Sequence, residues 1–126
     1  MRLAVAIALL GALGSLARWG LSGLVQRHVG LAFPAGTLVV NALGSVAIGA
    51  VMGAFSARGA EASPVRVALT AGFMGGFTTA SSFAYETWVL LERRALLAAA
   101  LNVGATVLVC VGGCALGVLA GRAAGR

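Results

Sequence analysis

Four apolar stretches, each long enough to cross a lipid bilayer, take up most of this chain of 126 residues. They cover residues 3–25, 33–55, 64–91 and 95–120. A helix needs about 20 apolar residues to span the hydrocarbon core, where every backbone polar group must be paired within the protein. Short polar segments at 26–34, 56–64 and 92–94 separate the stretches. The pattern predicts an all-α integral membrane protein with four transmembrane helices in a single domain over 1–126.

The charged residues are too few to give a soluble protein its polar surface. They make up 10% of the chain, whereas a soluble domain has roughly 25%. Nine are Arg and three are Glu, which gives a net charge of +6. In a soluble protein this excess would suggest nucleic acid as a partner. Because most of these Arg residues flank the apolar stretches, we interpret them as orientation signals and expect no nucleic-acid partner.

The distribution of the Arg residues gives only a weak orientation signal. With four spans both termini lie on one side, and that side would carry five of them: Arg2, Arg58, Arg66, Arg122 and Arg126. The other side would carry three, or four if Arg18 is counted. The bias leans toward cytoplasmic termini but hardly forbids the opposite orientation. The start of the chain is similar to a secretory signal, but its apolar run continues to Val25, so we interpret it as a spanning helix.

Small residues spaced four apart predict where the helices touch, because they let backbones approach closely. They are Gly49 and Gly53 in the second stretch, and Gly113, Gly117 and Gly121 in the fourth. Cys110 and Cys114 share one helical face, where a disulfide would unwind the helix, so we interpret them as packing residues. A single chain of four helices leaves little room for a pore along its own axis. A transport function would most simply require oligomerisation.

Two stripes of polar residues run along predicted spans at a spacing of four. They are Thr37, Asn41 and Ser45, and Asn102, Thr106 and Cys110. Residues four apart lie on one helical face. Such stripes either form interhelical hydrogen bonds, worth about 0.6 to 2 kcal/mol each, or line a polar path. Arg18, within the first stretch, is either a structural anchor or an attractor for anions in an aqueous vestibule.

The segment GFMGGFTTASSFAYE, residues 72–86, predicts an interruption of the third helix at membrane depth. Non-helical backbone is tolerated there only where it is buried in protein or faces a cavity. A Gly-Gly pair followed by Thr-Thr would free carbonyls for a cation and a helix N-terminus for an anion. The resumed helix then presents a polar face with one aromatic ring, whose electropositive edge could contact an anion. That face carries Thr79, Ser82, Phe83 and Glu86.

These segments resemble the Fluc family of small fluoride channels, also called CrcB. The resemblance covers nearly the whole chain. It rests on GALGSLARW at 11–19, FPAGTLVVNALGS at 33–45, the segment at 72–86, and the spacing of Asn102, Thr106, Cys110 and Gly117. It implies four helices per subunit, a broken third helix and an antiparallel dual-topology homodimer with two fluoride pores. It also implies passive, fluoride-selective export down the electrochemical gradient, fluoride resistance, and a multi-pass location in the bacterial inner membrane, in contact with lipid.

The resemblance further implies roles for individual residues. The pore asparagine of the family falls on Asn41, one of its two pore phenylalanines on Phe83, and its usual helix-4 pore serine on Cys110. The polar track of the family corresponds here to Ser81, Ser82 and Glu86, and the expected fluoride pore also includes Thr37 and Thr79. A structural Na⁺ at the dimer interface would be held by the backbone carbonyls of Gly75 and Thr78.

One position departs from the family pattern, because Ala80 stands where the first pore phenylalanine would be. This replacement bears on conduction rate and selectivity. Either Phe77 or Tyr85 supplies an aromatic surface instead, or the chain is one member of a heterodimeric pair. The near-balanced Arg distribution argues mildly against a heterodimer, since a fixed partner orientation is normally encoded by a clear charge bias.

A small multidrug exporter, also four-helical with dual topology, is the alternative function. That class exchanges protons for cations through a carboxylate in its first helix, and residues 3–25 contain no Asp or Glu. A purely structural membrane protein is a third interpretation. An enzyme is not expected, because the sequence shows no nucleophile–base pair and no metal-binding cluster.

Overall fold

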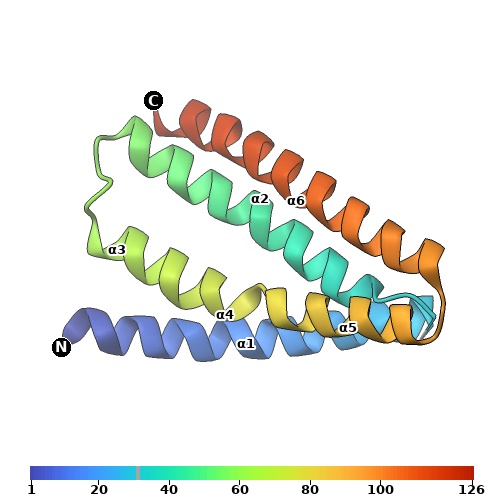
Figure 1. Ribbon diagram of the computed structural model, residues 1–126. Helices are drawn as coiled ribbons and strands as arrows, with labels where there is room; N and C mark the ends of the chain where they lie inside the picture. Colours follow the sequence, from blue (N-terminus) through green and yellow to red (C-terminus); the bar gives the residue numbers. More distant parts are fainter. Residues whose placement is uncertain (31) are drawn as a thin grey trace.

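The structure is a computed structural model that describes residues 1–30 and 32–126, and all regular structure in this part of the chain is helical. Two long helices come first, α1 (Arg2–Val29) and α2 (Ala35–Ala57). A third rod follows in four pieces: α3 (Pro64–Val67), the π-helical η1 (Ala68–Met74), α4 (Gly75–Phe77) and α5 (Ala80–Glu92). The last helix is α6 (Leu96–Gly125). The rods run alternately in opposite directions, so both termini lie at one end of the molecule (Figure 1).

Two helices run beyond their predicted bounds. The predicted span 3–25 ends four residues before α1 does, and the predicted span 95–120 ends five residues before α6 does. Hydropathy marks the apolar part of a helix, whereas backbone hydrogen bonding continues through polar residues such as Gln26 and Arg122. The helix α1 stops at Gly30, whose φ of 85° lies in the left-handed region that glycine adopts without strain. The predicted separator 26–34 also contains Leu31, which lies outside the described residues.

Proline lies at the start of two helices. Pro34 is the N-cap residue of α2, and Pro64 is the first residue of α3. A proline at the first helical position has no N–H to leave unpaired there, and its fixed φ suits the helix.

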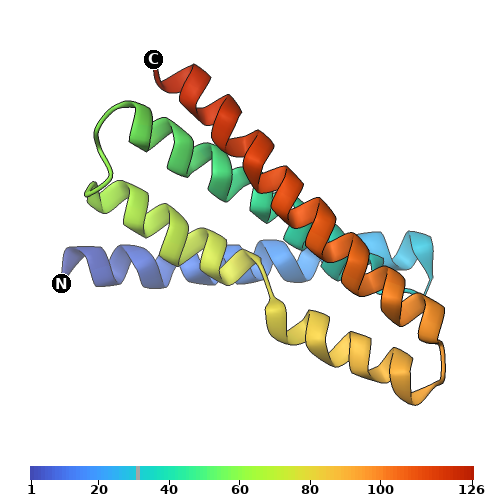
Figure 2. The ribbon, with the colours of Figure 1, turned by 45° about the horizontal axis from the view of Figure 1, so that its top comes forward.

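Glycine brings α2 and α6 into backbone contact, which confirms the packing predicted from the glycine spacing. The two helices make the most extensive contact in the fold and run in the same direction (Figures 1 and 2). A Cβ atom at Gly117 or Gly121 would overlap the backbone of Val46 or Ala50, and one at Gly49 would overlap the Cys114 carbonyl. A second pair forms between α1 and η1–α4, where Gly14 abuts the backbone of Phe73.

The piece α5 leaves this second pair. It is offset from the line of α3–α4 (Figure 2), and its most extensive contacts are with α6. The offset begins at Thr78 and Thr79, which separate α4 from α5. Because of this offset, the surface between α1, α2 and α5 is open.

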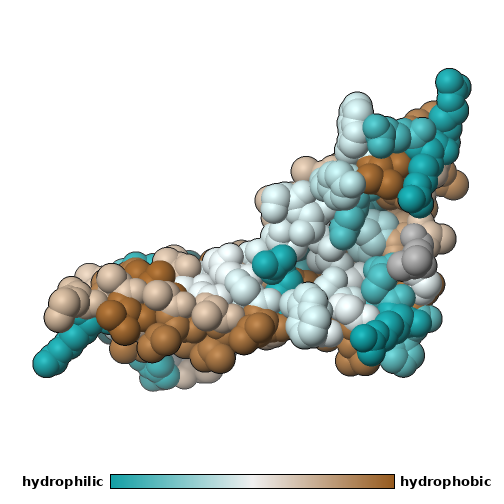
Figure 3. Space-filling model, turned by 90° about the horizontal axis from the view of Figure 1, so that it is seen from below, coloured by the Kyte–Doolittle hydropathy of each residue, from teal (hydrophilic) through white to brown (hydrophobic). Residues whose placement is uncertain are grey.

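The outer faces of the helices suit lipid. Large apolar side chains are exposed along α1 and α6, among them Leu9, Leu16, Leu108 and Leu116. Hydrophobic surface covers one arm of the molecule, and hydrophilic groups gather mainly toward the ends (Figure 3). Three helices, α1, α2 and α6, are long and apolar enough to cross a membrane. The third rod has no single piece of that length, because it is divided. The chain is therefore a multi-pass membrane protein.

Candidate functional site

The backbone between α4 and α5 is extended. Thr78 has φ −84° and ψ 158°, and Thr79 has φ −150° and ψ 112°. The β-branched side chain of threonine favours this conformation, and its hydroxyl can cap a new helix. The Thr79 Oγ1 accepts a hydrogen bond from the Ser82 backbone N–H at 3.2 Å. Thr79 is therefore the N-cap residue from which α5 begins.

Asn41 on α2 satisfies the backbone groups that the interruption releases. Its Nδ2 donates to the Thr79 carbonyl at 3.0 Å, and its Oδ1 accepts from the Thr79 N–H at 2.8 Å. In an uninterrupted helix that N–H would donate to the Gly75 carbonyl. The amide side chain forms this two-bond pairing while only 8% of its surface is exposed. Asn41 thus fixes the bend of the third rod to α2.

Arg18 on α1 holds the carbonyl on the other side of the interruption. Its Nε donates to the Gly76 oxygen at 3.1 Å, and the Ser15 Oγ donates to the same oxygen at 3.5 Å. In an uninterrupted helix the Ala80 N–H would be the donor. This is the contact with a carbonyl that the anchor interpretation of Arg18 requires. The guanidinium group also borders a surface hollow, so the same side chain is available to an ion there.

The first hollow, of about 400 Å³, gathers several predicted site residues around the start of α5. The Thr37 hydroxyl donates to Glu86 Oε1 across it at 2.7 Å, joining α2 to α5. Glu86 Oε2 is buried and has no hydrogen-bond partner among the described residues. The lining residues with polar side chains are Arg18, Trp19, Ser22, Gln26, Thr37, Thr79, Ser82 and Glu86. A cation, a carboxylate and several hydroxyls therefore face one space.

The second hollow, of about 300 Å³, is lined by both partners of the Asn41–Thr79 pairing. Its lining residues are Asn41, Gly44, Ser45, Ile48, Thr78, Thr79, Ala80, Phe83, Thr106 and Cys110. Thr79 lines both hollows, so the two spaces adjoin at the interruption. Thr106 Oγ1 is buried without a partner in the described part of the chain. Three predicted pore residues, Asn41, Phe83 and Cys110, thus border one space.

The hollows divide the predicted pore residues between them. Thr37, Ser82 and Glu86 border the first hollow, whereas Asn41, Phe83 and Cys110 border the second. Ser81 is exposed at the start of α5, and its hydroxyl lies 3.3 Å from Thr79 Oγ1. The sequence therefore placed these side chains in one region, and the fold arranges them as two spaces joined at Thr79.

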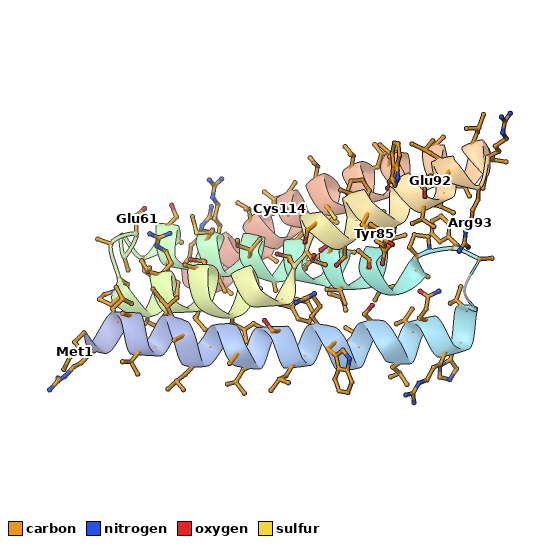
Figure 4. All side chains as sticks on the ribbon, turned by 60° about the horizontal axis from the view of Figure 1, so that its bottom comes forward. Met1, Glu61, Tyr85, Glu92, Arg93 and Cys114 are labelled. Carbon is orange, nitrogen blue, oxygen red and sulfur yellow. The ribbon has the colours of Figure 1, made fainter. Side chains whose placement is uncertain are left out.

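The two alternative aromatic residues lie elsewhere. Phe77 is buried and stacks on Phe73 with ring centroids 5.8 Å apart. Tyr85 is exposed and borders a third hollow near the end of α5, together with Arg93 (Figure 4). At Ala80 the wall of the second hollow carries only a methyl group, three residues before Phe83 on the same helix α5.

The backbone at Gly75 and Thr78 has the chemistry of a cation site. The Gly75 carbonyl faces no Thr79 N–H, because that donor is used by Asn41. Gly75 itself is exposed. Carbonyl oxygens suit hard cations. The residues present therefore fit the predicted Na⁺.

The structure assigns a role to Gln26 that the sequence did not predict. From the end of α1, its side chain donates to the Phe33 carbonyl at 2.9 Å and accepts from the Gly36 N–H at 3.2 Å. It also contacts the Gly30 carbonyl. Gln26 thus caps the start of α2, one residue before Thr37. An amide at the end of an apolar run was the only signal in the sequence.

The polar stripe on α6 serves two purposes. Asn102 is 1% exposed, and its Nδ2 donates to the Thr87 hydroxyl of α5 at 2.9 Å. Thr87 in turn donates to the Phe83 carbonyl at 2.7 Å. Asn102 is therefore an interhelical hydrogen bonder, whereas Thr106 and Cys110, one and two turns further on, border the second hollow.

Known proteins are similar to this chain over nearly its whole length. The family described as CrcB-like protein, Camphor Resistance (CrcB), matches residues 5–118. The fluoride-specific ion channel FluC of Geobacter sp. (strain M21) is 51% identical over 120 residues, covering 94% of this chain and 96% of that protein. The FluC protein of Geotalea daltonii (strain DSM 22248 / JCM 15807 / FRC-32) is 50% identical over 123 residues, covering 97% of this chain and 98% of that protein. With identity and coverage this high, the chain belongs to the CrcB family.

Proposed function

We propose that this chain forms a passive, fluoride-selective ion channel. The observation that carries the proposal is the Asn41–Thr79 pairing at the helix interruption, where two hollows that each contain polar side chains share Thr79. Fluoride is small and strongly hydrated, so a pore must replace its water with closely placed donors. The second N–H of Asn41, the nearby hydroxyls and the edge of the Phe83 ring are donors of this kind. The names of the relatives support fluoride as the ion.

The charges around the first hollow suit an anion that passes through without being trapped. Arg18 supplies an attractive charge, but its Nε is already engaged by the Gly76 carbonyl. Glu86 supplies a charge of the opposite sign in the same space, held by Thr37. An inside-negative membrane potential drives an anion outward by about 2.3 kcal/mol per 100 mV. This gradient suffices for export and fluoride resistance in the inner membrane of a bacterium.

An antiparallel homodimer would complete the site. On one chain the hollows open to the surface, and a channel needs a path closed on all sides. A second copy packed against the same face would supply the missing walls. The weak Arg bias supports insertion in both orientations, which an antiparallel pair requires.

A structural Na⁺ would hold the two subunits at their interruptions. Gly75 and Thr78 of each copy would contribute backbone carbonyls, and the ion would supply positive charge that no side chain provides there. In this chain, the pairing of Asn41 with the Thr79 N–H keeps the Gly75 carbonyl free of its helical donor. The ion is therefore expected to support assembly.

Ion flux from liposomes tests the proposed function. Purified protein in vesicles loaded with fluoride and chloride should release fluoride and retain chloride, as followed with ion-selective electrodes. A fluoride-sensitive bacterial strain carrying the gene should grow in fluoride and gain no resistance to cationic dyes. Equal release of both halides would contradict selectivity, and dye resistance would favour an exporter.

A further inference from the structure

Arginine residues gather at the end of the molecule where both termini lie. Four of them lie near the C-terminal ends of α2 and α6 and the start of α3: Arg58, Arg66, Arg122 and Arg126. The N-terminus, with Arg2, lies at the same end (Figure 1). Glu61 is the one acidic side chain of the α2–α3 connection (Figure 4). This end therefore carries five Arg residues and one Glu.

Two adjoining hollows open among these arginines. One, of about 270 Å³, is lined by Ser56, Ala57, Arg122 and Arg126. The other, of about 220 Å³, is lined by Met52, Gly53, Ser56, Glu61, Arg66, Val118 and Arg122. Ser56 and Arg122 border both. Each space has one hydroxyl and two guanidinium groups, with Glu61 also at the second, and paired guanidinium groups favour a phosphate group.

Two of these arginines, Arg58 and Arg66, contact backbone carbonyls or sulfur. Arg58 Nη2 donates to the Ala124 carbonyl at 3.4 Å, which ties the end of α2 to the end of α6. Arg66 Nε donates to the Glu61 backbone carbonyl, and Arg66 Nη1 lies 3.2 Å from the Met52 sulfur. These contacts leave the remaining guanidinium N–H groups available to an anion.

An apolar ledge adjoins the basic hollows. It consists of Met52, which is 41% exposed, and Val118, both of which line the second of these hollows. Both α2 and α6 are long and apolar enough to span a membrane, so their ends lie at its surface. A ligand with a phosphate at one end and an acyl chain at the other matches a basic hollow above an apolar ledge.

In the proposed antiparallel dimer, these arginines do not serve as orientation signals. Positive residues usually fix orientation, but a chain that inserts in both orientations cannot use them for that purpose. We propose that Arg66 and Arg122, with Ser56, form a binding site for the phosphate headgroup of an anionic phospholipid. The argument from orientation rests on the proposed antiparallel dimer, and the hollows and charges stand without it. An antiparallel dimer would hold one such lipid in each leaflet.

Lipid retention on the purified protein in neutral detergent tests this site. Native mass spectrometry should show phosphatidylglycerol retained in preference to phosphatidylcholine. Each Arg→Gln change at positions 66 and 122 should weaken retention about fivefold, because one Arg near a lipid surface contributes about a kilocalorie per mole. The matched control for the double change Arg66→Gln with Arg122→Gln is Arg93→Gln with Arg94→Gln, which also removes two positive charges, at the other end of the molecule. Arg122→Lys keeps the positive charge and should retain the lipid. This variant also tests whether the fold tolerates a substitution at position 122.

Other outcomes would overturn the site. Equal weakening by the control pair would show charge attraction without a defined site. Inorganic phosphate that competes as strongly as the lipid would show an adventitious ion only, with no use of the apolar ledge. Loss of lipid in Arg122→Lys, with unchanged elution on size exclusion, would also refute it. Since the measurement uses no ion flux, a protein that fails to conduct fluoride leaves the lipid result intact.

Discussion

Replacing Asn41 by Asp tests the centre of the proposed site, because it changes only the side-chain NH₂ group to an oxygen. In the unmodified chain, Asn41 Oδ1 lies 2.8 Å from the Thr79 nitrogen and Nδ2 lies 3.0 Å from the Thr79 oxygen. The carboxylate of the variant keeps the acceptor for the Thr79 N–H but has no donor for the Thr79 carbonyl. One oxygen then faces another, and a buried carbonyl is left unpaired at a cost of about 1–3 kcal/mol. The fold should be weakened by that amount and persist.

The effect on ion flux should be larger than the effect on stability. A fluoride ion about 4 Å from an ionised carboxylate is repelled by about 4 kcal/mol at an effective dielectric of about 20. This lowers occupancy roughly a thousandfold, since 1.4 kcal/mol is a factor of ten. Fluoride efflux from liposomes containing Asn41→Asp should therefore fall to the background of protein-free vesicles.

The pH dependence of fluoride flux through Asn41→Asp separates the effect of the introduced charge from a structural effect of the substitution. As pH falls, the carboxyl introduced at position 41 takes up a proton, which removes the charge and restores a donor to the Thr79 carbonyl. Flux should rise toward that of the unmodified protein, after subtraction of the leak of protein-free vesicles at each pH.

The matched control is Asn102→Asp. It removes a similar donor, to the Thr87 hydroxyl at 2.9 Å, but at a position that contributes to interhelical packing. This variant should lose stability and keep selective flux in the fraction that elutes as assembled protein. If the Asn41→Asp protein elutes normally and conducts fluoride at neutral pH as fast as the unmodified protein, the assignment of Asn41 to the pore is wrong.

Four further predictions follow from contacts elsewhere in the fold. Gly121→Ala should destabilise the protein by about 1–3 kcal/mol in thermal melts, because a Cβ there overlaps the Ala50 carbonyl; Gly104→Ala, in open space, should not. Arg18→Met should cost about 1.5–3 kcal/mol through loss of the charged donor to the Gly76 carbonyl, and Arg18→Gln should recover part of it. Glu86→Gln keeps an acceptor for Thr37 and removes a negative charge from the first hollow, so fluoride efflux should rise. Gly75→Val should lower the dimer fraction on size exclusion, and a normal dimer would count against the proposed Na⁺ site.

The sequence by itself determined the class of the protein and the packing of two of its helices. Apolar length decides how many helices can cross a bilayer, and proline and glycine act through their own backbone geometry. For this reason the starts of α2 and α3 and the close contact of α2 with α6 could be predicted from local patterns. The extra turns of α1 and α6 could not, because hydropathy does not report where backbone hydrogen bonding ends.

Only the tertiary structure decided which polar groups meet. Asn41 and Asn102 occupy similar stripes in the sequence, yet one pairs with the Thr79 backbone and the other with the Thr87 hydroxyl. The fold brings Arg18 both to the Gly76 carbonyl and to the edge of the first hollow, which its position in the sequence does not reveal. In lipid a polar side chain pairs with whichever polar groups lie within its reach, because no water competes for it. Those groups are set by where the third rod is interrupted and by how α1, α2 and α6 pack around it.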